Sequence, residues 1–207
     1  MSIIRPFKGI RPRADLASAI AALPYDVYNS EEAREIVAAE PKSFLQIDRA
    51  ETLLPKGTNP YSEAVYKTAS ETLNRMIDEG SFLQDKEPCY YLYALTMNGR
   101  TQTGLVGCAS IDDYCNNVIL KHENTLEAKE QDRIRHIDAC SAQTGPIFLA
   151  YRADKKLGEL IKNVRLTPEV YDFTSDDGIR HEVWRIDKMS TIVDISKIFE
   201  AIPHLYI

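Results

Sequence analysis

Apolar positions along the chain recur at a helical period in some segments and at a strand period in others. The clearest helical pattern is NPYSEAVYKTASETLNRMIDEG, residues 59–80, where apolar residues return every three or four positions. Gly80 follows where a helix is expected to end. The residues predicted to line its buried side are Ala64, Val65, Tyr66, Ala69, Leu73, Met76 and Ile77.

Other segments show the same period over shorter lengths. Asn29 and Glu32 form a capping-box pattern at the start of SEEAREIVAAE, and Pro24 and Pro41 interrupt the pattern on either side of this region. The segments predicted to be helical are 15–23, 30–40, 124–140, 155–164 and 189–202.

Strand-like runs gather around two turn dipeptides. Asn98-Gly99 separates the β-prone runs of residues 89–111, and Asp177-Gly178 separates EVYDF from IRHEVWRID, so each pair is predicted to form a hairpin. Further strands are expected in the opening IIRPFKGIRP, in SFLQIDR (43–49), in TGPIFLAY (144–151) and in HLYI (204–207).

The mixture of helices with antiparallel hairpins predicts an α/β or α+β fold, in which a mixed sheet has flanking helices. No internal repeat, low-complexity tract or long linker divides the chain, so we expect residues 1–207 to form a single globular region. The expected strand HLYI stops at Ile207, and we expect that a longer protein has been truncated at this residue.

Composition narrows the classes of partner. Apolar residues make up 44% and charged residues 27%, which is typical of globular proteins, and the net charge of −6 gives no general attraction to nucleic-acid phosphates. No apolar run is long enough for a membrane span, and the N-terminus lacks a signal-peptide core. The sequence therefore predicts a cytoplasmic protein without a membrane or nucleic-acid partner.

The common cofactor and catalytic motifs are absent from the sequence: there is no dinucleotide-binding glycine motif, P-loop or nucleophile elbow. His122-Glu123 resembles the start of a zinc-protease motif, but Leu126 stands where the second histidine would be needed. The four cysteines have no C-x-x-C spacing and are expected to be reduced thiols, so no metal site is predicted.

The segment KHENTLEAKEQDRIRH (121–136) carries the best candidates for chemistry. On a helix, Thr125, Lys129, Arg133, His136 and Cys140 fall on one stripe bordered by Asp132, while Leu126, Ile134 and Ile137 form an adjoining face suited to contact a core. Lys129 and Arg133 could bind a phosphate or carboxylate, and Glu123 and His136 are nearby acid/base candidates. A solvated helix with ordinary ion pairs is the competing interpretation.

Two loops supply weaker candidates. Asp26 in PYDVYN could cap the next helix, stabilise the turn or bind a ligand, of which the first two are favoured. Arg49 and Glu51 follow an expected strand end, where they could bind a ligand or form a surface ion pair.

A set of short motifs occurs in a characteristic order. These are RPFKGIRP (5–12), PYDV (24–27), FLQIDRAE (44–51), KHENT (121–125), Lys129, Asp132-Arg133 and GPI (145–147). The set resembles the domain of unknown function 1015 family of bacteria and archaea over essentially the whole chain. Ala50 departs from the family pattern, which has a proline there, so the shape of the loop after Arg49 is less certain.

The resemblance implies a longer protein. Family members are roughly twice as long and continue from a segment like HLYI into an A-D-G-H-H-R box, similar to the active-site box of ParB/sulfiredoxin-like folds and of free-serine kinases. Some members are labelled ParB-like or helix-turn-helix regulators. The resemblance also favours a functional role for Lys121, His122, Glu123, Thr125, Lys129, Asp132 and Arg133.

Three functional hypotheses follow. The first is a nucleotide-dependent phosphotransferase-like domain that acts on a small metabolite such as a hydroxy amino acid, with ATP or ADP and Mg²⁺, and whose site is completed beyond Ile207. Its phosphate ligands would be Lys129 and Arg133, and its catalytic residues Glu123, His122 and Asp26. The others are a ParB-like DNA-associated regulator and a non-catalytic scaffold domain; the oligomeric state is left open.

Overall fold

The computed structural model describes residues 1–122 and 125–207. The chain divides into two compact units, each made of segments that are separate in the sequence. Unit 1 comprises Met1–Ala14, Gln84–Glu123 and Phe148–Ile207, and unit 2 comprises Asp15–Leu83 and Asn124–Ile147. Helices and antiparallel strands occur together, as the sequence predicted, and the fold is of the α+β kind.

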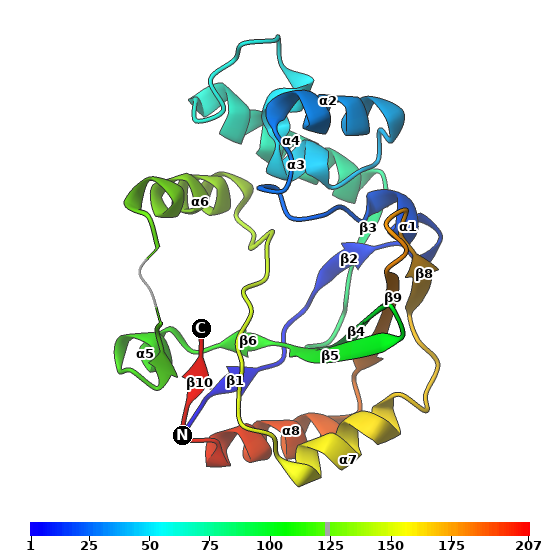
Figure 1. Ribbon diagram of the computed structural model, residues 1–207, viewed down its shortest axis with the longest axis vertical. Helices are drawn as coiled ribbons and strands as arrows, with labels where there is room; N and C mark the ends of the chain where they lie inside the picture. Colours follow the sequence, from blue (N-terminus) through cyan, green and yellow to red (C-terminus); the bar gives the residue numbers. More distant parts are fainter. Residues whose placement is uncertain (123–124) are drawn as a thin grey trace. The chain divides into compact units, whose positions relative to one another are not determined.

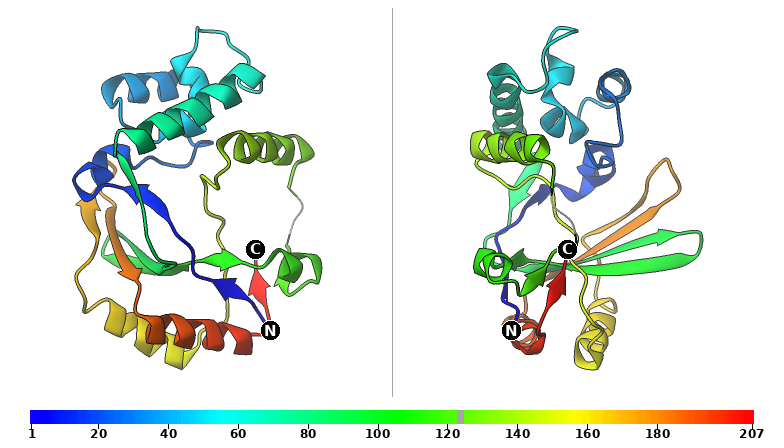
Figure 2. Two further views of the ribbon diagram at one scale, coloured as in Figure 1. Left: turned by 180° about the vertical axis from the view of Figure 1, so that it is seen from behind. Right: turned by 60° about the vertical axis from the view of Figure 1, so that its left-hand side comes forward.

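A four-stranded antiparallel sheet with the order β5-β4-β9-β8 dominates unit 1 (Figure 1). The strands are β4 (Tyr90–Met97), β5 (Arg100–Val106), β8 (Tyr171–Thr174) and β9 (Arg180–Ile186). Asn98 (φ 51°) and Gly99 (φ 75°) form the tight turn between β4 and β5, because both turn positions need a positive φ. Both predicted hairpins are confirmed, and Figure 2 shows them extending in the same direction from the body of unit 1.

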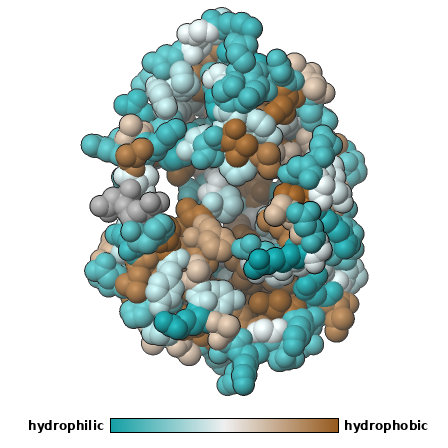
Figure 3. Space-filling model, in the orientation of Figure 1, coloured by the Kyte–Doolittle hydropathy of each residue, from teal (hydrophilic) through white to brown (hydrophobic). Residues whose placement is uncertain are grey.

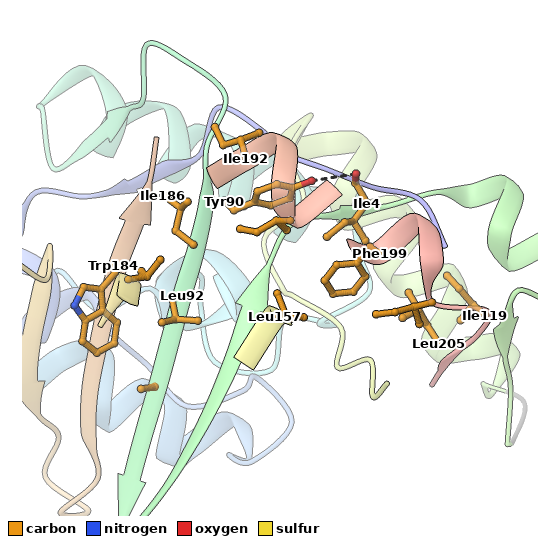
Figure 4. Packing of buried hydrophobic residues seen from close by; sticks show 14 residues of the cluster. Ile4, Tyr90, Leu92, Ile119, Leu157, Trp184, Ile186, Ile192, Phe199 and Leu205 are labelled. Atoms are coloured by element: carbon orange, nitrogen blue, oxygen red, sulfur yellow. Dashed lines mark hydrogen bonds between the residues drawn. The ribbon is translucent and has the colours of Figure 1, made fainter. Parts of the chain in front are cut away.

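One face of this sheet carries the core of unit 1. Leu92, Trp184 and Ile186 of β4 and β9 lie in one buried cluster with residues of α7 (Lys155–Val164) and α8 (Met189–Ala201), part of which is drawn in Figure 4. Tyr90 is fully buried there, and its hydroxyl donates a hydrogen bond to the carbonyl of Ile4 at 3.1 Å. The strand period therefore places Leu92 and Trp184 on the buried side.

Short strand pairs complete unit 1. β1 (Ile4–Arg5) pairs antiparallel with β6 (Cys108–Ala109), and β10 (Leu205–Tyr206) pairs parallel with β7 (Ile119–Leu120). The chain also forms α5 (Ile111–Cys115) and the short strands β2 (Ile10–Pro12) and β3 (Phe82–Gln84).

Unit 2 is helical. Its elements are η1 (Ala14–Leu16, which begins one residue before the unit), α1 (Ala17–Ile20), α2 (Ser30–Ala39), α3 (Leu45–Asp48), η2 (Ala50–Leu53), α4 (Glu63–Asp78) and α6 (Glu127–Cys140). The capping box of α2 is confirmed, since Asn29 accepts from the Glu32 amide and the Glu32 side chain accepts from the Asn29 amide. The core of unit 2 is formed by α3, η2 and the buried side of α4, together with Cys140 of α6.

Three predictions about local structure are wrong. SFLQIDR is not a strand: Leu45, Gln46 and Ile47 are all buried in the short helix α3, whereas alternation would have exposed every second residue. TGPIFLAY is not a buried strand either, because Ile147 and Phe148 are 61% and 70% exposed and only Ala150 forms a β-bridge. On α4, Ala64 lies on the exposed side and Thr72 on the buried side.

Among the residues that the structure describes, no helix combines the length and the apolar character that a membrane crossing requires.

Candidate functional site

Helix α6 turns two polar residues and one cysteine toward the interior of unit 2. Asp132, His136 and Cys140 are its buried residues, and their spacing of four places them on one side of the helix. Leu126 and Ile134 are 74% and 43% exposed, so the prediction that they hold the helix against a core is wrong. The visible surface of α6 is mostly hydrophilic in Figure 3.

Asp132 accepts hydrogen bonds from two side chains, Tyr66 and Arg133. The Tyr66 hydroxyl of α4 donates to Asp132 Oδ1 at 2.9 Å, while Arg133 Nη2 and Nε donate to Oδ2 at 2.7 and 3.1 Å. Burial, followed by the hydrogen bond to Asp132, raises the pKa of Tyr66 to about 12, so Tyr66 remains a neutral donor near pH 7. The orientation of the Arg133 guanidinium is therefore fixed from inside the unit.

The two basic side chains of the predicted stripe share one aromatic ring. Arg133 Cζ lies 4.1 Å from the centroid of the Tyr25 ring, and Lys129 Nζ lies 5.9 Å from the same centroid. Both separations are within the range of cation–π attraction, to which Arg contributes by stacking and Lys by its point charge. The structure thus brings Lys129 and Arg133 together with Tyr25 of the PYDV loop. We call these three residues the Tyr25 surface.

Arg49 holds the loop that presents Tyr25. Its Nη1 donates to the carbonyls of Tyr25 and Tyr28 at 2.9 and 2.6 Å, and its Nη2 donates to Ser30 Oγ at 2.9 Å. Arg49 Nε completes the set with a 2.7 Å ion pair to Glu51, whose side chain is only 4% exposed. The pair is internal rather than on the surface, and it supports the loop.

A second polar cluster lies beneath the C-terminal half of α6. His136 Nε2 is 3.1 Å from the carbonyl of Ile47, which can only accept, so this nitrogen carries the proton. Thr144 donates to Asp48 Oδ1 at 3.0 Å, and Asp48 Oδ1 is 4.0 Å from His136 Nε2. Burial raises the pKa of Asp48.

Sequence reasoning missed Asp48 and Thr144 as members of this cluster. The available signal was positional: Asp48 lies within FLQIDRAE, and Thr144 directly precedes GPI. Their partner His136 was placed on the polar stripe, but its carbonyl partner on α3 comes from a segment 89 residues away, which helical spacing does not reveal.

Other predicted site residues have different surroundings. Lys121 belongs to unit 1, where its Nζ is 3.6 Å from the Tyr114 ring centroid, and His122 Nδ1 contacts the carbonyl of Ile207 in the same unit. Thr125 is exposed, and Glu123 lies outside the described residues. Asp26 is exposed in a turn; it does not cap α2, because Asn29 does.

The RPFKGIRP motif has a structural environment of its own in unit 1. Arg11 forms two hydrogen bonds of 2.9 Å with Asp85, which also accepts from Arg185 and from the Tyr91 hydroxyl. Burial opposes ionisation of Asp85, but the hydrogen bonds from Arg11 and Tyr91 outweigh it and lower the pKa to about 2. The amide of Gly9 donates to Tyr91 Oη at 3.2 Å.

The chain matches one family model. The model is described as "Protein of unknown function (DUF1015)", and the match covers residues 4–207. The chain belongs to this family. No curated protein and no solved structure matches the chain significantly.

Three of the motifs that resemble the DUF1015 pattern lie in unit 2. Tyr25 comes from PYDV, Asp48 and Arg49 come from FLQIDRAE, and Arg133 comes from α6. These motifs are far apart in the sequence, yet in unit 2 Arg133 stacks on Tyr25, Arg49 donates to the Tyr25 carbonyl and Asp48 lies near His136.

The charged side chains gathered at the Tyr25 ring are those of Lys129 and Arg133. Within residues 1–122 and 125–207, no group of three or more His, Cys, Asp or Glu side chains could hold a metal ion. Cys108 and Cys115 are exposed, whereas Cys89 and Cys140 are buried; burial raises the pKa of Cys140 to about 11, which leaves a thiol rather than a thiolate ligand. The Tyr25 surface instead presents two cations.

Proposed function

We propose that the Tyr25 surface binds the phosphoryl group of a small metabolite or nucleotide, as part of a phosphotransferase-like domain of the DUF1015 family. The observation that carries the proposal is the orientation of Arg133, which buried Asp132 and Tyr66 hold against the Tyr25 ring beside Lys129. A cation fixed before the ligand arrives loses little side-chain entropy on binding, which favours affinity.

The distribution of charge supports an anionic ligand. Arg133 uses Nε and Nη2 for Asp132, and no hydrogen bond joins its Nη1 to another described residue. Asp132 offsets the charge of Arg133, and Lys129 adds a further positive charge close by. A phosphate oxygen could accept from Arg133 Nη1 while the Lys129 ammonium provides a point charge.

The finer assignment concerns the reaction. We propose ATP or ADP with Mg²⁺ as the nucleotide, and a hydroxy amino acid as the type of acceptor. Phosphoryl transfer depends mainly on positioned positive charge, with a carboxylate that binds Mg²⁺ or accepts the hydroxyl proton. In this proposal Asp26, in the same loop as Tyr25, has that carboxylate role.

Isothermal titration with pyrophosphate, ADP, ATP and phosphoserine, each with and without Mg²⁺, tests binding. Arg133→Ala and Lys129→Ala should each weaken binding about tenfold or more, because a hydrogen bond or ion pair to a charged group contributes about 1.5–3 kcal/mol. Arg135→Ala is the matched control: it removes the same charge from an exposed position of α6 and should leave affinity unchanged.

Urea unfolding of the same variants separates binding from folding. Equal weakening by Arg133→Ala and Arg135→Ala would show that only the overall charge of α6 matters and would contradict a built site. Absence of binding to every phosphate probe by the stable wild-type chain would reject the proposal. Duplex DNA is included as a further ligand to test the ParB-like alternative. The net charge of −6 does not favour that alternative.

A further inference from the structure

Strand β5 (Arg100–Val106) is an end strand of the sheet in unit 1, and it lacks most of the features that usually protect a sheet edge. It is seven residues long, contains neither Pro nor Lys, and pairs with β4 in one uninterrupted register from Val106 to Arg100. The opposite end strand, β8, has only four residues and carries the exposed ion pair of Asp172 with Arg180. Of the two edges of this sheet, the β5 edge is therefore the better suited to accept another strand.

The two-residue turn determines which backbone groups of β5 point outward. A hairpin with such a turn closes on a hydrogen-bonded pair, here Met97 and Arg100, and such pairs alternate along an antiparallel ladder. Arg100, Gln102, Gly104 and Val106 therefore bond to β4, which leaves the amides and carbonyls of Thr101, Thr103 and Leu105 on the open edge. The 2.7 Å contact between the Thr96 and Thr101 hydroxyls agrees with a non-hydrogen-bonded pair, where side chains approach most closely.

We propose that this edge binds the β5 strand of a second copy of the chain in an antiparallel, two-fold symmetric pair centred on Thr103. This register places Thr103 opposite its equivalent and Thr101 opposite Leu105 of the second copy. Each outward residue then meets another outward residue, so all the open amides and carbonyls of both strands form hydrogen bonds. The two four-stranded sheets become one continuous sheet.

Side-chain pairing in this register favours a second copy as the occupant. Thr103 pairs with Thr103 across the axis, which is a favourable cross-strand combination. The only charged residue of the strand, Arg100, lies opposite Val106 and not opposite its own copy, so no like charges meet. Gln102 lies opposite Gly104, where an added Cβ would have nothing within 4 Å, so the longer side chain has space.

A charge-swap experiment tests the register. Size-exclusion chromatography with light scattering, over the micromolar to submillimolar range, should show the wild-type chain as a dimer. Thr103→Lys and Thr103→Glu should each be monomeric, because like charges then face each other at the axis. A 1:1 mixture of the two variants should restore a dimer, a result that misfolding of either variant could not produce.

Disulfide trapping provides an independent measurement in a Cys108→Ser, Cys115→Ser background. Thr103→Cys should cross-link under mild oxidation, since a hydrogen-bonded pair has a Cα separation of about 5.5 Å, within the range for a disulfide. Gln102→Cys is the matched control and should remain uncross-linked, because its partner position is Gly104. A monomeric wild-type chain throughout the concentration range, or a dimer that survives both charged substitutions, would overturn the proposal.

Discussion

Gly9 lies where the backbone must pass directly against the Tyr91 hydroxyl. A Cβ added at Gly9 would be 2.4 Å from Tyr91 Oη, closer than any normal contact, so the two groups would have to separate. We expect Gly9→Ala to lower the free energy of unfolding by about 1–3 kcal/mol, the usual cost of overpacking. Urea unfolding measures this value.

Gly158 provides the control for that substitution. It lies within α7, where an added Cβ meets nothing within 4 Å. Gly158→Ala should therefore stabilise the chain by up to about 1 kcal/mol, through the better helix propensity of alanine. If Gly9→Ala is as harmless as Gly158→Ala, the close approach at Tyr91 does not constrain the backbone.

Asp85 should make the stability of unit 1 vary with pH in the acidic range. Its folded-state pKa of about 2 lies below the ordinary value of 3.8, so ionised Asp85 stabilises the folded state above pH 3.8. This contribution is lost as the pH falls from 3.8 to about 2. Stability measured by denaturant titration across this range should fall in the wild-type chain and change less in Asp85→Asn, whose amide does not titrate.

At the scale of single elements, the N-terminus of α2 offers a measurable contribution. Asn29 accepts hydrogen bonds from the amides of Glu31 and Glu32, which would otherwise lack partners within the helix. Asn29→Ala should destabilise the chain by about 1 kcal/mol, and Asn29→Asp should restore most of this. Equal stability of Asn29→Ala and wild type would show that unfolding of α2 is not coupled to the main transition.

Elements with strong local signals were predictable from the sequence, whereas those defined by distant partners were not. Asn98-Gly99 and the Asn29–Glu32 box determine their local geometry through backbone chemistry, so the hairpin and α2 were predicted correctly. The buried side of α6 was not, because Asp132 is held by Tyr66 from 66 residues away. The short apolar run of α3 has no length or period that distinguishes a strand from a helix.

The candidate site was predictable in part for the same reason. Helical spacing alone placed Lys129 and Arg133 on one side of α6, as the structure does. It could not identify Tyr25 as their shared contact, or Arg49 as the support of the Tyr25 loop, because both relations depend on tertiary packing.

At the scale of the whole molecule, each unit has a hydrophobic core formed from its own residues. Leu157 belongs to the core of unit 1 and Met76 to that of unit 2. Leu157→Ala and Met76→Ala should each cost about 2–5 kcal/mol. Hydrogen exchange followed by mass spectrometry should show lost protection mainly in the strands of unit 1 for the first variant and in the helices of unit 2 for the second. Uniform loss along the chain in both variants would indicate a single cooperative transition.

The discontinuous units impose an order on folding during synthesis. Unit 2 has all its residues once position 147 has left the ribosome, but unit 1 still lacks β8, β9, α7, α8 and β10. Until β9 emerges, the β4–β5 hairpin has no strand beside β4, and the apolar side chains of Leu92 and Ala94 have no helices to cover them. The nascent chain is therefore most prone to aggregation over this interval, when chaperone binding would protect it most.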